Sequence, residues 1–144
     1  MNNPFRHRCA IDIRFVDMDA LGHVNNAHYF TYIEQGRIDY FKTVIGENIN
    51  WALTGLILAH AEMDYKMPIV LGDSIFVYTC CTRLGNRSFD MAYRFVKLLD
   101  GTEMEMATGK TTLVCYDYSQ KSTIPIPELW RRCMMDYDQP STLQ

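Results

Sequence analysis

The sequence predicts an α+β fold, in which a mainly antiparallel sheet of five strands packs against one long helix. Apolar and polar residues alternate with a period of two over most of the chain, which is typical of strands. Residues 26–45 instead repeat their apolar residues with the period of a helix. Two turn-forming pairs, Gly85-Asn86 and Asp100-Gly101, separate three consecutive strand segments, and this arrangement predicts an antiparallel meander.

Each expected strand is a run of alternating or β-branched and aromatic residues that a turn signal ends. The five strands are predicted at residues 11–15, 57–65, 75–84, 88–99 and 103–116. Pro68 and the pair Gly72-Asp73 interrupt the pattern after the second strand. The order is therefore one strand, the long helix and then four strands.

The long helix has apolar and aromatic residues around most of its circumference, so we expect the sheet to wrap around it. Asn25 or Asn26 can cap its start, and Gly46 suits its end. Gly36 in its interior costs about 1 kcal/mol relative to alanine, and a close approach to the sheet would explain its presence. A short second helix is predicted at residues 127–135, with Pro127 at its first position.

Composition fits one domain over residues 1–144, with its core at 8–117 and a loose polar tail at 136–144. The net charge of −3 and the lack of a basic run argue against nucleic-acid binding. No stretch approaches the roughly 20 apolar residues that cross a bilayer, and no secretory leader is recognisable. Five cysteines without a C-x-x-C pair indicate reduced thiols, hence a cytoplasmic protein without a metal site.

A polar cluster precedes the long helix. It contains two carboxylates, a histidine and two amides: Asp17, Asp19, His23, Asn25 and Asn26. A helix N-terminus has unpaired N–H groups and a partial positive charge, so it can stabilise a developing oxyanion. A nearby carboxylate would stay ionised and could act as base or nucleophile. The same residue types also precede helices as caps alone, so composition leaves both interpretations open.

The cluster resembles a known signature. Residues 17–29 resemble the D-x-D-x-x-G-H-V-N-N-x-x-Y motif of hotdog-fold thioesterases, in the 4-hydroxybenzoyl-CoA thioesterase-like or acyl-CoA thioesterase group. Residues 32–37 are similar to its Y-x-E-x-x-R continuation, and residues 65–73 to its Y-x-x-P-x-x-x-G-D turn. The resemblance runs from about residue 8 to 116 in the same order. It implies a curved five-stranded sheet around one central helix, followed here by the short C-terminal helix.

The resemblance also implies an activity. It implies hydrolysis of an acyl thioester, carried by coenzyme A or an acyl-carrier protein, to a free acid and a thiol. Asp19 would be the catalytic carboxylate, as nucleophile or general base, and the backbone N–H of Asn26 would hold the carbonyl oxygen. Coenzyme A belongs to the substrate, and no cofactor is implied. The family forms homodimers or homotetramers with the site between subunits.

Further residues receive supporting roles from the same resemblance. They are Asp17, Gly22, His23, Asn25, Tyr29 and Glu34. Glu34 is also spaced to pair with Arg37 on the helix. Arg83, Arg87 and Ser88 flank a hairpin and are candidates for binding the phosphates of coenzyme A. Some relatives carry a histidine where this chain has Asn26. A mechanism in which a histidine at this position acts as the acid is therefore not available to this chain.

Two other functions remain as alternatives. A hotdog acyl hydratase or dehydratase would use a catalytic histidine with an acid near the helix, yet neither an H-F-x-x-x-P nor a D-x-x-x-x-H motif stands at the expected place. A non-catalytic module that binds acyl-CoA or acyl-carrier protein is the second alternative. The presence of Asp19 argues against it.

Overall fold

The computed structural model describes residues 4–142. Within that range the chain forms seven strands, two α-helices and one 3₁₀ helix. In order they are β1 (His7–Ile11), η1 (Phe15–Asp17), α1 (His28–Val44), β2 (Gly55–Tyr65), β3 (Ile75–Leu84), β4 (Ser88–Leu99), β5 (Thr102–Asp117), β6 (Ser122–Thr123), α2 (Glu128–Asp138) and β7 (Ser141–Thr142).

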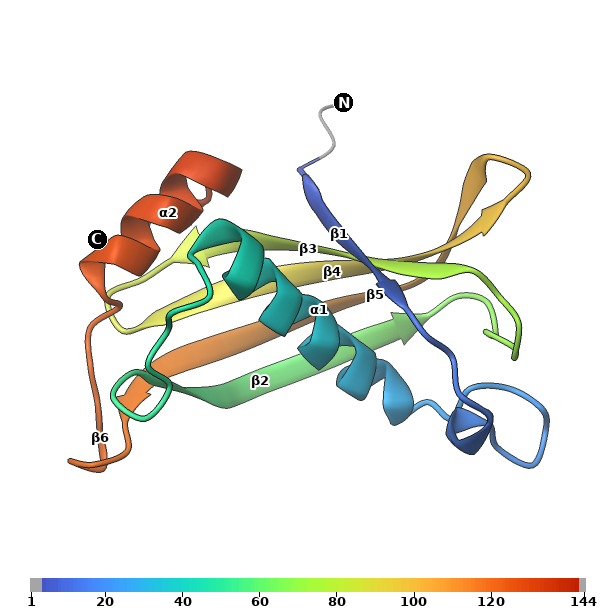
Figure 1. Cartoon of the computed structure of the whole chain (residues 1–144), viewed down its shortest axis with the longest axis horizontal. Coiled ribbons are helices and arrows are strands. Elements are labelled where there is room, and N and C mark those ends of the chain that lie inside the picture. Colours follow the sequence, from blue (N-terminus) through green and yellow to red (C-terminus); the bar gives the residue numbers. More distant parts are fainter. Residues whose placement is uncertain (1–3, 143–144) are drawn as a thin grey trace.

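The strands form one sheet in the order β1-β3-β4-β5-β2, with antiparallel neighbours throughout. Two-residue strands extend it, since β6 pairs with β5 and β7 pairs in parallel with β3. The expected count of five strands therefore needs correction to seven, because periodicity cannot reveal strands of two residues. Helix α1 lies along one face of the twisted sheet, as in a hotdog fold (Figure 1).

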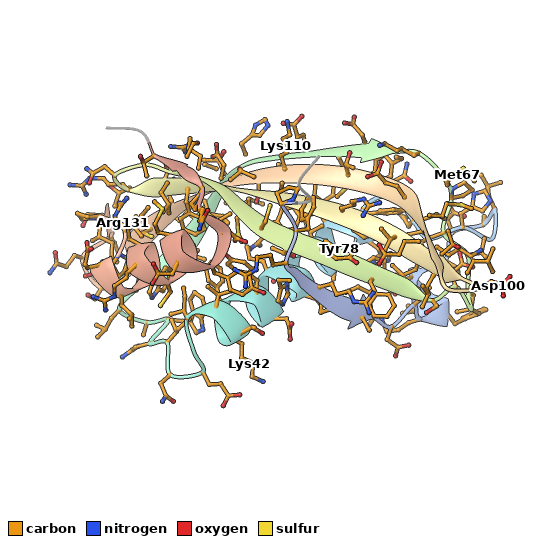
Figure 2. The ribbon with its side chains drawn as sticks, turned by 90° about the horizontal axis from the view of Figure 1, so that it is seen from above. Lys42, Met67, Tyr78, Asp100, Lys110 and Arg131 are labelled. Atoms are coloured by element: carbon orange, nitrogen blue, oxygen red, sulfur yellow. The ribbon has the colours of Figure 1, made fainter. Side chains whose placement is uncertain are left out.

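The two faces of the sheet differ. Figure 2 shows Lys42 on the α1 side of the molecule and Lys110 on the opposite side of the sheet. The core lies between α1 and the sheet, where Tyr32, Phe41 and Phe95 are almost fully buried. The predicted bounds of β3 and β4 are confirmed, because the Gly85-Asn86 and Asp100-Gly101 turns end these strands.

The first strand is displaced from its predicted place. We expected residues 11–15, whereas β1 covers His7–Ile11. Ile11 pairs with Ile75, the first residue of β3, so the chain beyond Ile11 has no β3 residue to pair with. It turns instead into η1, where the Asp17 side chain accepts hydrogen bonds from Arg14.

Helix α1 approaches the sheet closely at Gly36. A Cβ atom at this position would lie 3.1 Å from Oγ1 of Thr79 and 3.1 Å from Cγ1 of Val77. The close approach expected from the sequence is therefore confirmed. Gly46 ends the helix as predicted, with φ of +137° and its N–H bound to the carbonyl of Phe41.

The C-terminal segment is more ordered than expected. Helix α2 continues to Asp138, three residues beyond the predicted end, and β7 follows it. The Asp138 carboxylate accepts hydrogen bonds from the Tyr40 hydroxyl and, at 2.8 Å, from the N–H of Cys81. These tertiary contacts hold the segment that was predicted to be a loose tail. Residues 143–144 of that tail lie outside the described range.

Candidate active site

The loop between η1 and α1 is held by its own backbone and by a neighbouring segment. The N–H of Asp19 donates to the carbonyl of His23 at 2.7 Å, and the N–H of Asn25 donates to that of Asp17 at 2.9 Å. The N–H of Val24 donates to the carbonyl of Ile69 at 2.8 Å, which fixes the loop against the chain after β2. Such a loop can hold side chains in a defined geometry.

Asp19 uses one carboxylate oxygen to shape this loop. Its Oδ1 accepts hydrogen bonds from the N–H groups of Leu21 at 2.9 Å and His23 at 3.2 Å. Gly22, between the two donors, has φ of +79°, a conformation that favours glycine. No hydrogen bond within residues 4–142 reaches Oδ2 of Asp19, so this oxygen is available to a ligand.

A pocket of about 280 Å³ is lined by residues of two of the family motifs, the one at residues 17–29 and the one at residues 65–73. The loop contributes Asp19, His23 and Asn26, and the end of β2 contributes Tyr65 and the residues that follow it. Tyr29 of α1 also lines the pocket, and its ring packs edge-on against that of Tyr65, with 4.8 Å between centroids. The sequence predicts this loop as the site but assigns no role there to Tyr65 and Lys66.

Asn26 presents a free backbone donor at the start of α1. The side chain of Asn25 accepts from the N–H of Ala27 at 2.9 Å, and its carbonyl accepts from the N–H of His28 at 2.9 Å. The N–H of Asn26, in contrast, has no acceptor in the described part of the chain. Asn25 thus supports the turn before the helix, while Ala27, without a side-chain cap, occupies the cap position.

Asp17 is buried outside the pocket. It accepts hydrogen bonds from the Tyr32 hydroxyl at 2.6 Å and from Nη2 of Arg14 at 2.9 Å. Burial raises the pKa of this carboxyl group, but the hydrogen bonds from Arg14 and Tyr32 outweigh that effect and lower the pKa to about 2. The structure therefore gives Asp17 contacts suited to support. The sequence pattern does not predict Arg14 and Tyr32 as its partners.

Glu34 lies away from Asp19. It lines a second, larger hollow of about 440 Å³ between α1 and the first half of β2, together with Arg37, Trp51 and Leu58. Arg37 donates to the Tyr93 hydroxyl at 3.1 Å, and no ion pair joins Glu34 to Arg37 among the described residues. The pairing suggested by their spacing is therefore absent from the structure.

The candidates for phosphate binding lie at the other end of the sheet. Ser88 pairs with Val114 of β5, whereas Tyr65, at the pocket, pairs with Ala107 of the same strand. This seven-residue interval corresponds to roughly 23 Å. Arg83 binds Asp90 and Ser88, and Arg87 binds the carbonyl of Thr123. One subunit does not bring these residues to the Asp19 pocket.

Burial is the main influence on the pKa of three of the cysteine thiols. Cys80, Cys81 and Cys115 are buried, and burial raises the pKa of each to about 12. Residues 4–142 contain no group of three histidine, cysteine or acidic side chains placed to hold a metal ion. None of the helices described is long and apolar enough to span a membrane.

Comparisons with known proteins agree with the motifs. A profile of the Thioesterase-like superfamily matches residues 13–132. The 1,4-dihydroxy-2-naphthoyl-CoA hydrolase of Synechococcus elongatus is 32% identical over 121 residues, which cover 81% of this chain and 85% of that protein. The uncharacterized protein YsmA of Bacillus subtilis is 29% identical over 85 residues, and the match spans 58% of this chain and 56% of that protein.

A solved structure extends the similarity to the fold. The thioesterase of Thermus thermophilus, crystallised with coenzyme A and zinc, superimposes with a TM-score of 0.80 at 32% identity. The match covers 96% of this chain and 98% of that protein. With the family profile matching most of its length, the chain belongs to the Thioesterase-like superfamily.

Proposed function

We propose that this thioesterase hydrolyses an acyl-CoA to a free acid and coenzyme A in the cytoplasm, with Asp19 as the catalytic carboxylate. One observation carries the proposal. A carboxylate with a free oxygen and the residue with a free helix-terminal N–H, Asp19 and Asn26, line the same pocket. The named activity of the Synechococcus relative, which is a CoA hydrolase, supports the substrate class.

The chemistry follows from these two groups. The thioester oxygen accepts a hydrogen bond from the N–H of Asn26, and the positive end of α1 favours the charge that develops there. Asp19 then either removes a proton from an attacking water or attacks the carbonyl carbon itself. In the second route a mixed anhydride with Asp19 forms, and a water then cleaves it to release the acid and restore the carboxylate. The carbon–sulfur bond breaks, and the thiolate leaves and takes up a proton. Water is the only co-reactant, so we propose no cofactor.

The supporting residues keep narrower roles in this proposal. Gly22 lets the loop turn around the Asp19 carboxylate, and His23 and Tyr29 line the pocket. Asn25 orients the turn that exposes the Asn26 N–H. Acyl-carrier protein remains an alternative carrier of the same thioester. A module that only binds the thioester, or an acyl hydratase, is the alternative function.

We propose that two or more copies assemble through β2, which ends the sheet and leaves one edge open in the described chain. Such an edge is normally paired or protected. If two copies pair about a two-fold axis, the start of one β2 lies beside the end of the other. The hollow lined by Arg37 and Leu58 would then adjoin the partner's Asp19 pocket. A dimer or a tetramer of this kind builds each site from both subunits.

This geometry also bears on the phosphates of coenzyme A. Arg83, Arg87 and Ser88 lie too far from the pocket to serve the site of their own subunit. Across the proposed two-fold axis their end of the sheet turns toward the partner's pocket. We therefore retain them as candidates for binding phosphates at the partner's site.

A thiol-release assay over a panel of acyl-CoA substrates tests the function. Asp19→Asn is expected to lower kcat about 100-fold or more on the best substrate, because the amide is neither base nor nucleophile. Asp12→Asn removes an exposed carboxylate outside the pocket and serves as the control. Wild-type turnover in the Asp19 variant would refute the assignment. Binding of acyl-CoA by the wild type without release would support the binding-module alternative instead.

A further inference from the structure

We infer that Tyr65 is a positioning residue for the oxyanion donor, because its phenol fixes the peptide group next to the N–H of Asn26. The Tyr65 hydroxyl donates a hydrogen bond of 2.8 Å to the carbonyl oxygen of Asn26. Tyr65 comes from the end of β2 and reaches a residue 39 positions away in the chain. The inference rests on the proposed function, since it concerns the donor used in that reaction.

The peptide groups around Asn26 are all engaged except the proposed donor. The peptide that joins Asn26 to Ala27 is held on both sides, because its carbonyl accepts from Tyr65 and its N–H donates to the Asn25 side chain. The peptide before it is held by its carbonyl, which accepts from the N–H of His28. The remaining N–H, that of Asn26, therefore has a direction set by its neighbours.

Tyr65 provides the short hydrogen bond to this carbonyl. The other donor to it, the N–H of Tyr29, lies at 3.4 Å, near the limit for a hydrogen bond. Without the phenol, the carbonyl of Asn26 would keep only this long contact from the first turn of α1. The Asn26–Ala27 peptide would then be held mainly through the N–H of Ala27, so the direction of the adjacent Asn26 N–H would be fixed less firmly.

The base of the Tyr65 side chain is itself held in place. Tyr65 is the last residue of β2 paired with β5, where it faces Ala107. The next two N–H groups, of Lys66 and Met67, both donate to the carbonyl of Met106, at 2.9 and 3.0 Å. Because Tyr65 is anchored in the sheet, its hydrogen bond to Asn26 fixes the loop that precedes α1 relative to the sheet.

A direct catalytic role fits the geometry less well. The phenol has one proton, and it is engaged with the Asn26 carbonyl. The ring packs edge-on against buried Tyr29 while 42% of the residue stays exposed, so its orientation is held by packing on one side. Its effect on the reaction is therefore expected to pass through Asn26.

Steady-state kinetics of Tyr65→Phe test the inference. Loss of the hydroxyl should lower kcat about 10-fold, since misplacement of a catalytic group by even 1 Å is costly, and should leave KM within about twofold. Tyr78→Phe is the matched control. It removes a phenol that binds Glu103 and lies away from the pocket, and its kcat should equal that of the wild type (Figure 2).

A spectroscopic readout separates positioning from stability. In the Asp19→Asn background, the carbonyl stretch of a bound thioester reports the hydrogen bond from the Asn26 N–H. Adding Tyr65→Phe should move this stretch to higher frequency, and adding Tyr78→Phe should not. This comparison needs a folded protein that binds the thioester, but no turnover.

Several outcomes would overturn the inference. A kcat within twofold of wild type, or an unchanged carbonyl stretch, would show that the hydrogen bond is only structural. A raised KM at unchanged kcat would place the phenol in contact with substrate instead. An equal loss in Tyr78→Phe would show a general effect of removing a phenol. If the wild type releases no thiol from any substrate, the proposed function fails first, and the inference fails with it.

Discussion

The Tyr32 phenol donates a hydrogen bond of 2.6 Å to Oδ2 of Asp17, and this contact joins α1 to η1, on either side of the loop that carries Asp19. Asp17 is fully buried, and its second oxygen binds the Arg14 guanidinium. The carbonyl of the same residue accepts from the N–H of Asn25. One aspartate thus ties together both ends of the loop that carries Asp19.

Asp17 is expected to make stability depend on acid. Its folded pKa of about 2 lies below the ordinary value of 3.8, so its ionisation stabilises the fold above about pH 5. This contribution is lost as the pH falls toward 2, because the carboxylate must then be protonated. Asp17→Asn should cost about 1–3 kcal/mol of unfolding free energy at pH 7. Urea denaturation at pH 7 and pH 3 should show this difference shrinking in acid. A constant difference would contradict the prediction.

Asp138 is expected to behave in the opposite way. Burial raises its pKa, only partly offset by the hydrogen bonds from Tyr40 and Cys81, and its Oδ1 is buried without a hydrogen-bond partner in the described chain. A raised carboxyl pKa means that ionisation opposes folding as the pH rises above about 4. Asp138→Asn keeps the acceptor oxygen without the charge, so at pH 7 it should be at least as stable as the wild type. Asp138→Ala removes the acceptor and should lose about 1–3 kcal/mol. The thermal unfolding midpoints of the two variants, compared with that of the wild type, separate the effect of the Asp138 charge from that of its hydrogen bonds.

Gly36 is expected to resist replacement despite its helical setting. Alanine would favour the helix by about 1 kcal/mol. Its Cβ, however, would lie 3.1 Å from Thr79 and Val77, and overpacking of a core typically costs about 1–3 kcal/mol. Gly36→Ala should therefore lower the unfolding free energy measured in urea. The neighbouring Gln35→Ala, on the exposed side of α1, should have little effect. If Gly36→Ala were more stable than the wild type, β3 would have to move away from the added methyl group without loss of unfolding free energy.

Local pattern was sufficient to predict several elements and to single out the loop of the candidate site. The turn pairs after Leu84 and Leu99 end strands whether or not the rest of the fold is known. The helical period of α1 is equally local. The loop with Asp19 could be singled out as a candidate because its polar residues and its motif lie within a few consecutive residues. What these features share is that short stretches of sequence determine them.

The missed features depend on contacts between distant segments. The alternation at residues 11–15 suits a strand, but β3 begins at Ile75 and offers nothing beyond Ile11 to pair with. Tyr65 reaches Asn26 across 39 residues, and Asp138 reaches Tyr40 across 98. No periodicity in the sequence predicts such long-range contacts, so the hydrogen bond of Tyr65 and the contacts of the C-terminal segment are seen only in the fold.

The open edge of β2 gives the last prediction. Leu58 is 49% exposed and lines the hollow beside α1, a position that a partner subunit would cover in the proposed assembly. Leu58→Lys would place a charge in that contact, so light scattering should show the mass of a single chain where the wild type shows at least two. Leu99→Lys is the control, because Leu99 is 50% exposed at the far end of β4 and its replacement should leave the mass unchanged. If each site draws on both subunits, thiol release should fall together with the assembly of Leu58→Lys. A wild type that is monomeric at micromolar concentration and still active would refute the shared site.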